Sequence, residues 1–250
     1  MKKIISVVVV LFFVSAVVSA GTWGGFGYML GYAETNDFWN NKELPINSLL
    51  RSHGFSELSP LSFGFGGGGG SFMGDYYFGG WGGGSFSFES SNTSSNMTFQ
   101  KLTGVGGLEG GFIFSAGSLV VIPTMSFLWG STEYSIMQVP TGVVDFETAL
   151  SNPGYKVDIV SDDFDIGAGV NMLFNANGFM GVMVKAMYFY RTWENWYVQG
   201  TGSNSYSISG VPKSSPHRFF LGVGFAFGGF HTGDDDVDNR NVDSASDIGQ

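Results

Sequence analysis

The residues that could do chemistry are few in this sequence and widely spaced. The chain has three histidines: His53, His217 and His231. A histidine beside a serine and an acidic residue could activate the serine for attack on a lipid ester, and Ser214, Ser215 and Glu194 lie near His217 along the chain. Nothing in this spacing fixes a mutual geometry, and a single histidine at a surface is more often solvated. We therefore predict a protein that is not an enzyme.

Metal, nucleotide and nucleic-acid sites are not predicted either. Asp234, Asp236 and Asp238 have the spacing of a calcium loop but lack its glycine and its distal glutamate. The glycine run Gly66–Gly70 is not followed by Gly-Lys-Ser/Thr, so it is not a phosphate-binding loop. There is no cysteine, no zinc-type spacing and no basic stripe, and the formal net charge is −10. We expect no cofactor, no metal and no nucleic-acid partner.

The two ends of the chain predict export and a solvated tail. Lys2 and Lys3, a short apolar run and the small residues before position 21 are typical of a signal peptide. Residues 1–20 are predicted as signal peptide, 21–232 as one β-barrel and 233–250 as an acidic disordered tail. No later segment has about 20 uncharged apolar residues, as a transmembrane helix requires. An exported soluble β-protein and a closed membrane barrel remain open.

Alternation with a period of two is the main structural signal. In residues 164–174 the even positions are apolar and the odd positions are mostly aspartate, glycine or asparagine, which is the pattern of a strand with two different faces. Pro123 should cause a bulge or a missing hydrogen bond in its strand. The same reasoning predicts eight strands, near residues 23–32, 61–72, 76–88, 98–114, 119–129, 164–174, 180–191 and 218–228.

The connections between these strands alternate between short and long. Short turns fall near residues 73–74, 116–117 and 176–178, whereas residues 33–59, 89–97, 131–157 and 195–215 are long loops. This sorting is typical of membrane barrels, and a Greek-key sandwich would not produce it. The prediction is an all-β fold, an eight-stranded antiparallel up-and-down transmembrane β-barrel with short periplasmic turns and long extracellular loops.

One hairpin fixes a testable register. If residues 176–178 form a three-residue loop with Gly178 in the left-handed conformation, Asp163 faces Arg191 across the two strands. Both side chains would then point into the barrel, within salt-bridge distance.

The glycines of residues 63–88 are expected to make room inside the barrel. An eight-stranded barrel is just wide enough for its own side chains, so a large inward group such as Trp81 needs small neighbours. The alternative is that Gly66–Gly70 forms a flexible turn, since glycine weakens a strand by about 0.5–1 kcal/mol relative to alanine.

Charged residues on the inward faces predict an ion network in the lumen. Because an unpaired charge away from water is costly, these groups should pair into a plug; the alternative is a narrow pore lined by charge. The predicted network consists of Lys101, Glu109, Asp163, Asp165, Lys185, Arg191 and Arg218.

The pattern as a whole resembles the small eight-stranded outer-membrane barrels of the OmpA and OmpX type. The most specific piece is Gly222, Phe225 and Phe227 in the last strand, similar to the assembly signal of such barrels. Phe220 departs from that signal, and the chain continues past Phe230. The resemblance implies the outer membrane of a Gram-negative cell as location, with outer-membrane lipid and the barrel-assembly machinery as partners.

The long loops carry the functional prediction. Leu44, Ile46, Leu49, Leu50 and Phe55 have a partly helical spacing, so the first long loop is expected to form a short amphipathic helix over the barrel mouth or the membrane interface. The third long loop, residues 131–157, could pack against it. We predict a non-enzymatic barrel with a structural or surface-contact role, in which exposed loops meet an extracellular partner. A narrow ion-conducting pore and a lipid-modifying enzyme at the rim are the alternatives.

Overall fold

The computed structural model describes residues 24–36, 45–87, 90–92, 96–138, 156–175, 179–199, 205–208, 211 and 215–229. The predicted signal peptide and acidic tail lie outside these residues, as does most of the third long loop. In the described part of the chain, no helix is long and apolar enough to cross a membrane.

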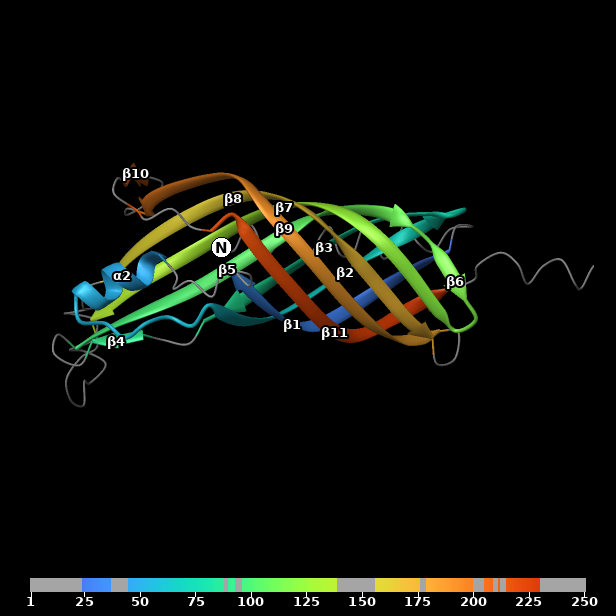
Figure 1. Cartoon of the computed structure of the whole chain (residues 1–250), viewed down its shortest axis with the longest axis horizontal. Coiled ribbons are helices and arrows are strands. Elements are labelled where there is room, and N and C mark those ends of the chain that lie inside the picture. Colours follow the sequence, from blue (N-terminus) through green and yellow to red (C-terminus); the bar gives the residue numbers. More distant parts are fainter. Residues whose placement is uncertain are drawn as a thin grey trace, which may run out of the picture.

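Eight long strands form a closed antiparallel ring (Figure 1). Around the ring, β1 pairs with β2, β2 with β3, β3 with β5, β5 with β7, β7 with β8, β8 with β9, β9 with β11 and β11 with β1. The fold predicted from the sequence is confirmed. The strands of the ring are β1 (Gly25–Asn36), β2 (Leu61–Met73), β3 (Tyr76–Phe86), β5 (Met97–Phe112), β7 (Leu119–Gln138), β8 (Lys156–Asn175), β9 (Met180–Gln199) and β11 (His217–Gly229).

Three short strands and one helix add to this ring. The sheet thus has eleven strands among the described residues instead of the predicted eight, but each added strand has only three residues. These elements are α2 (Pro45–Ser52), β4 (Ser90–Asn92), β6 (Phe114–Ala116) and β10 (Ser205–Ser207).

Strand β6 continues β5 after a local interruption. Gly111 pairs with Thr124 on β7 and Phe114 pairs with Val121, so the register is unchanged while the pairing opposite Pro123 is missing. This is the missing pairing expected at a proline, which donates no ladder hydrogen bond.

The two ends of the barrel differ. Tight turns close one end, here called the turn end, where Gly74 and Gly117 adopt positive φ angles of 60° and 59°. The other end, called the loop end, carries α2, β4 and β10 (Figure 1). Strands β7, β8 and β9 each have 20 residues, whereas β1 has 12, so the wall at the loop end is taller on the side of β7–β9.

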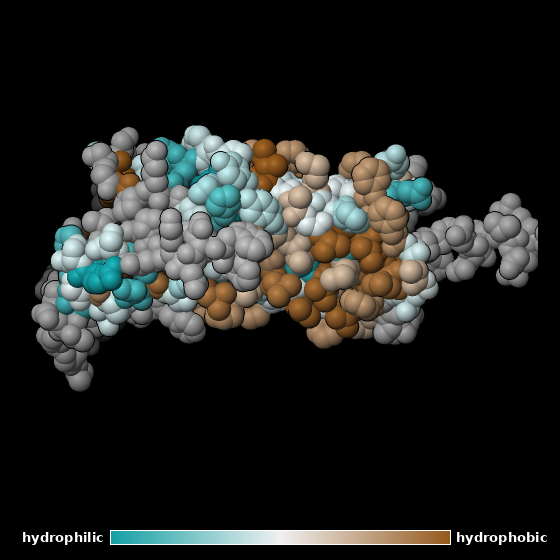
Figure 2. All heavy atoms as spheres, in the orientation of Figure 1, coloured by the Kyte–Doolittle hydropathy of each residue, from teal (hydrophilic) through white to brown (hydrophobic). Residues whose placement is uncertain are grey.

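The outer wall is apolar in the part that lies toward the turn end. Phe65, Leu108 and Phe225 are more than half exposed on different sides of the ring. Figure 2 shows the hydrophobic side chains gathered toward the turn end, with more polar side chains toward the loop end. On β7 the apolar part of the outward row ends with Trp129, and the next outward residues, Ser131 and Glu133, are polar. We call the apolar zone the belt; hydrocarbon is the solvent in which such a surface is stable.

The glycine run lies within β2, so the flexible-turn alternative is wrong. Gly66–Gly70 pair with both β1 and β3. A Cβ atom on Gly64 would lie 2.5 Å from the Tyr32 ring, and one on Gly68 would lie 2.7 Å from Cβ of Trp81. The inward glycines therefore make the space that the aromatic rings fill, as predicted.

The predicted register of the β8–β9 hairpin is wrong by two residues. Asn175 pairs with Gly181, so the connection is longer than the expected three-residue loop. Asp163 consequently faces Glu194, and Arg191 faces Asp165. The predicted ion pair nevertheless exists, with 3.1 Å between Arg191 and Asp163, because both side chains point inward and arginine is long enough to reach past its direct neighbour.

Candidate functional site in the barrel lumen

A fully buried ion pair lies in the part of the lumen nearer the turn end. Lys185 on β9 and Glu109 on β5 are in direct contact, and neither side chain is exposed. Tyr77 donates a hydrogen bond to Glu109 at 2.8 Å and Tyr28 donates another at 3.3 Å, while Lys185 donates to Asn171 at 3.2 Å. We call these five residues the inner ionic cluster. Each charge has several partners, which is the condition under which a buried pair is tolerated.

Five charged residues form a second group nearer the loop end, the outer ionic cluster: Asp163, Asp165, Arg191, Glu194 and Arg218. Arg218 lies 2.9 Å from Asp163 and 3.3 Å from Asp165. Arg191 lies 2.7 Å from Glu194 and 3.1 Å from Asp163. Each arginine thus bridges two carboxylates, as the planar guanidinium group allows.

A β-bulge completes the outer ionic cluster. The register of β8 and β9 shifts between Phe164 and Asp165, which leaves Thr192 as an extra residue on β9. The Thr192 hydroxyl donates to the Phe164 carbonyl oxygen at 2.9 Å. In a regular strand with no bulge, Arg191 and Glu194 would point to opposite faces, since they are three positions apart. With it, both point into the lumen.

Two further charged side chains lie near the outer ionic cluster without forming an ion pair. Lys101 on β5 is buried and donates a long hydrogen bond of 3.4 Å to Ser62. Glu34 on β1 is buried and accepts a hydrogen bond from Ser85 at 2.5 Å. Among the described residues, no carboxylate lies within salt-bridge distance of Lys101.

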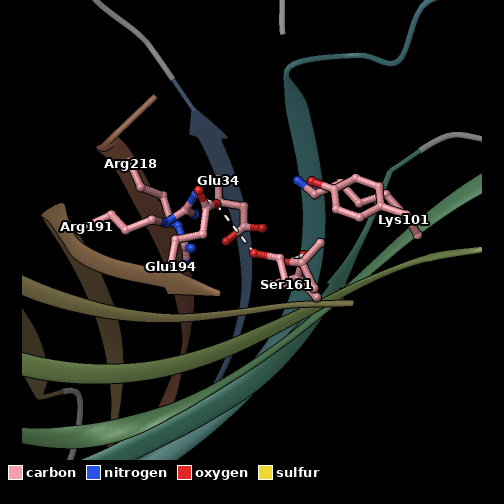
Figure 3. A pocket seen from close by; sticks show the side chains of 9 residues that line it. Glu34, Lys101, Ser161, Arg191, Glu194 and Arg218 are labelled. Carbon is pink, nitrogen blue, oxygen red and sulfur yellow. Dashed lines mark hydrogen bonds and ion pairs between the residues drawn. The ribbon is translucent and has the colours of Figure 1, made fainter. Parts of the chain in front are cut away.

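A small polar cavity separates these groups (Figure 3). Its volume is about 20 Å³, which is room for about one water molecule. Figure 3 shows Arg191, Arg218 and Glu194 on one side and Lys101 across the cavity. Thr103, Thr132, Tyr134 and Ser161 supply hydroxyl groups to its wall.

An apolar layer separates the two ionic clusters. On β9, Met187 and Phe189 lie between Lys185 and Arg191, and both are buried. The Trp81 ring lies 4.9 Å from the Phe220 ring and 6.2 Å from the Phe189 ring, measured between centroids. We call Trp81, Met187, Phe189 and Phe220 the aromatic layer. Its side chains come from β3, β9 and β11 and meet across the lumen, between the two ionic clusters.

The loop end is closed by a separate apolar cluster. Leu50 of α2 and Leu58 are buried against Phe99 of β5 and Tyr134 of β7. Within this segment the Asn47 side chain exchanges two hydrogen bonds of 2.9 Å with the Leu58 backbone. Burial raises the pKa of the Tyr134 hydroxyl. The predicted amphipathic helix is therefore present, and it lies over the barrel mouth.

All seven charged residues predicted for the lumen point into it, but they belong to different groups. Glu109 and Lys185 are in the inner ionic cluster; Asp163, Asp165, Arg191 and Arg218 are in the outer one; Lys101 lines the cavity. The ion network predicted from the sequence left out four residues that contact its charged groups or line its cavity: Tyr28, Glu34, Tyr77 and Glu194. For Glu34 the signal was available, since it continues the inward row of Tyr28 and Tyr32 once β1 is extended to Asn36.

The residues proposed for assembly lie on β11. Phe225 is 63% exposed on the outer wall, and Gly222 pairs with Lys185 of β9. Recognition of Gly222, Phe225 and Phe227 by the assembly machinery stays a prediction.

The candidate catalytic residues do not converge. His217 Nδ1 lies 2.6 Å from the Tyr188 hydroxyl, and the His217 ring packs on Tyr190 of the outer wall. Glu194 instead points into the lumen, on the other face of the sheet. Ser215 accepts a 3.3 Å hydrogen bond from the His217 backbone N–H, and Ser214 lies outside the described residues. Within the described ranges, no group of three or more His, Cys, Asp or Glu side chains could hold a metal ion.

A closed up-and-down ring with an apolar belt and a packed lumen defines an outer-membrane β-barrel protein. Comparison with solved structures agrees. The fold is shared with a major outer membrane protein from Thermus thermophilus, with a TM-score of 0.53 at 10% sequence identity over 82% of this chain and 98% of that one.

Two other solved structures match less closely. They are OprG from Pseudomonas aeruginosa, with a TM-score of 0.44 at 8% identity over 82% and 95% of the two chains, and the attachment invasion locus protein Ail of Yersinia pestis bound to a heparin analogue, with 0.39 at 14% over 82% and 99%. No family model and no curated protein matches the sequence. The likeness establishes the fold and leaves the function open.

Proposed function

We propose that this protein is a non-conducting, non-enzymatic scaffold of the outer membrane that acts through its extracellular end. The observation that carries the proposal is the filled lumen. From the turn end outward, the inner ionic cluster, the aromatic layer and the outer ionic cluster occupy the barrel in succession, and α2 covers the mouth. A barrel packed in this way has no room for solute flow.

The shape of the barrel supports action at the cell surface. Short turns of outer-membrane barrels face the periplasm, so the loop end faces outward. There β7, β8 and β9 continue beyond the belt and form a rigid wall. β7 ends at Gln138 and β8 begins at Lys156, so both strands that flank the sequence between them reach this outward end, where a partner can be met.

Conductance in planar lipid bilayers tests the closed lumen. The wild-type protein should give no stepwise current, whereas a variant with Trp81→Ala, Phe189→Ala and Phe220→Ala should conduct because it removes the aromatic layer. A matched control replaces the outward residues Phe65 and Phe225 by alanine and should stay silent. Regular current steps from the wild-type protein would favour the narrow pore.

The surface role is tested in cells. Replacing residues 139–155 by a short Gly-Ser linker should leave heat-modifiable gel migration unchanged and reduce cell aggregation or adhesion. If removal of the whole protein raises sensitivity to detergent and the linker variant restores resistance, the role is structural. Equal adhesion and equal detergent resistance with and without the protein would contradict both forms of the proposal.

A further inference from the structure

The inner face of the tall wall is apolar where a water-filled mouth would be polar. Phe99 of β5, Tyr134 and Ile136 of β7, Ile159 of β8 and Trp196 of β9 line it. These five residues lie beyond the belt, and we call them the vestibule wall. Neighbouring members are in register, since Phe99 pairs with Ile136, and the Tyr134 and Trp196 rings stack at 5.3 Å. An apolar surface of this kind in a soluble region marks a site that something covers.

The floor below the vestibule wall carries charges of both signs, since Glu34 and Glu194 line the same cavity as Lys101, Arg191 and Arg218. Lys101 pairs with Tyr134 in the β5–β7 register, so Lys101 lies beside the aromatic part of the vestibule wall. Arg191 and Arg218 line the same cavity, but their charges are already shared with the carboxylates of the outer ionic cluster. Lys101 has only the 3.4 Å hydrogen bond to Ser62, which leaves a buried cation short of partners.

A segment of the same chain covers the vestibule wall. Leu50, Phe55 and Leu58 pack on it, and Phe55 meets Phe99 edge to face at 6.4 Å. We call residues 45–58 the strap. Its polar contacts with the barrel are made to β4. The Ser56 hydroxyl donates to the Ser90 hydroxyl, and the Asn92 side chain donates to the His53 carbonyl oxygen of the strap. The strap supplies apolar side chains to the wall but no carboxylate to Lys101.

We propose that the vestibule is a binding site for an amphipathic carboxylate, and that the strap occupies it in the absence of the ligand. The hydrocarbon part of the ligand takes the places of Leu50, Phe55 and Leu58 on the vestibule wall. The carboxylate group reaches the floor and pairs with Lys101, which the strap leaves unpaired. The aromatic layer below stays in place, so binding does not require conduction, and the two proposals can fail separately.

Photo-crosslinking in lipid nanodiscs tests this site. The probes are dodecanoate and dodecanol that each carry a diazirine group, with mass-spectrometric mapping of the labelled peptides. In the variant with Leu50→Asn and Leu58→Asn, dodecanoate labelling of the peptides that contain Tyr134 and Trp196 should rise by about tenfold or more, because the apolar contacts of the strap are lost and no new charge is introduced. Ser48→Asn, on the exposed side of α2, is the matched control and should leave labelling at the wild-type level.

Lys101→Gln in the strap variant separates charge recognition from apolar partition. Dodecanoate labelling of the vestibule should fall by about tenfold, the effect of one charge-assisted hydrogen bond, and dodecanol labelling should not change. Labelling confined to the belt, or an equal loss for both probes, would overturn the proposal. Heat-modifiable migration shows that each variant is folded.

Tryptic cleavage of the wild-type protein tests displacement of the strap without using the strap variant. Dodecanoate should displace the strap and speed tryptic cleavage after Arg51, which is exposed at the end of α2. Dodecanol should have a smaller effect. Cleavage that is the same with and without dodecanoate would count against a strap that leaves its site.

Discussion

At the scale of single residues, the buried charges of the lumen are arranged as compensated pairs. Lys185 and Glu109 illustrate this, since both side chains are fully buried and each also meets a neutral polar side chain. Such a pair adds little net stability over apolar packing, but loss of one member leaves the other charge uncompensated. We therefore propose that the inner ionic cluster fixes which strands meet across the lumen.

Replacement of Lys185 tests this interpretation. Lys185→Met should destabilise the barrel by about 3–5 kcal/mol, because Glu109 then remains charged and buried. Adding Glu109→Gln to Lys185→Met should recover most of the loss. Urea unfolding in lipid vesicles, followed by tryptophan fluorescence, gives both values. Equal destabilisation by the single and double variants would show that packing alone explains the effect.

The glycines offer a matched pair of substitutions. Gly68→Ala places a Cβ atom in steric conflict with the Gly80 carbonyl oxygen, a contact that the rigid ladder cannot relieve. Gly104→Ala points outward, with nothing within 4 Å. We expect a loss of about 1–3 kcal/mol for Gly68→Ala and a slight gain for Gly104→Ala, since alanine is the better strand residue. Equal effects in urea unfolding would contradict the space-filling role of the inward glycines.

At the scale of elements, alternation in the sequence predicts which strands exist and which face of each is apolar. The inward rows of β8, β9 and β11 follow directly from it. The ends of β7, β8 and β9 could not be predicted, because beyond Trp129 and Trp193 the outer face becomes polar and the alternation signal disappears. Pairing with neighbouring strands, not the pattern of each strand alone, extends them into the loops.

The β-bulge at Thr192 is the feature that sequence alternation could not reveal. A single extra residue inverts the faces of everything after it, which is why Glu194 was missed and the hairpin register was wrong. Deletion of Thr192 should restore a regular ladder in which Arg191 and Glu194 still point into the lumen and Trp193 still points outward. The expected result is that the heat-resistant folded band on a gel is kept, and loss of that band would contradict the assignment of Thr192 as the extra residue. Thr192→Val, which keeps the bulge and removes only the 2.9 Å hydrogen bond, should cost about 1 kcal/mol and still fold.

At the scale of the whole molecule, the barrel is a rigid wall between two solvents. Its outer face is apolar because hydrocarbon surrounds it, and its interior holds charge pairs and aromatic packing in succession. The alternation of residues along each strand predicted an apolar outer face and a polar inner face. It also predicted that the lumen charges point inward. It did not predict that they separate into two clusters, because the aromatic layer between them depends on contacts among β3, β9 and β11, which are distant in sequence.

The direction of the side chains on β7 tests the central claim most directly. The chain has no cysteine, so single cysteines can be introduced and spin-labelled without background. In lipid bilayers, collision with dissolved oxygen should be high for labels on the outward row and low for those on the inward row. The outward row is Met125, Phe127 and Trp129, and the inward row is Thr124, Ser126 and Leu128. Oxygen access that does not alternate, or that is higher on the inward row, would contradict a closed barrel with its apolar face in lipid.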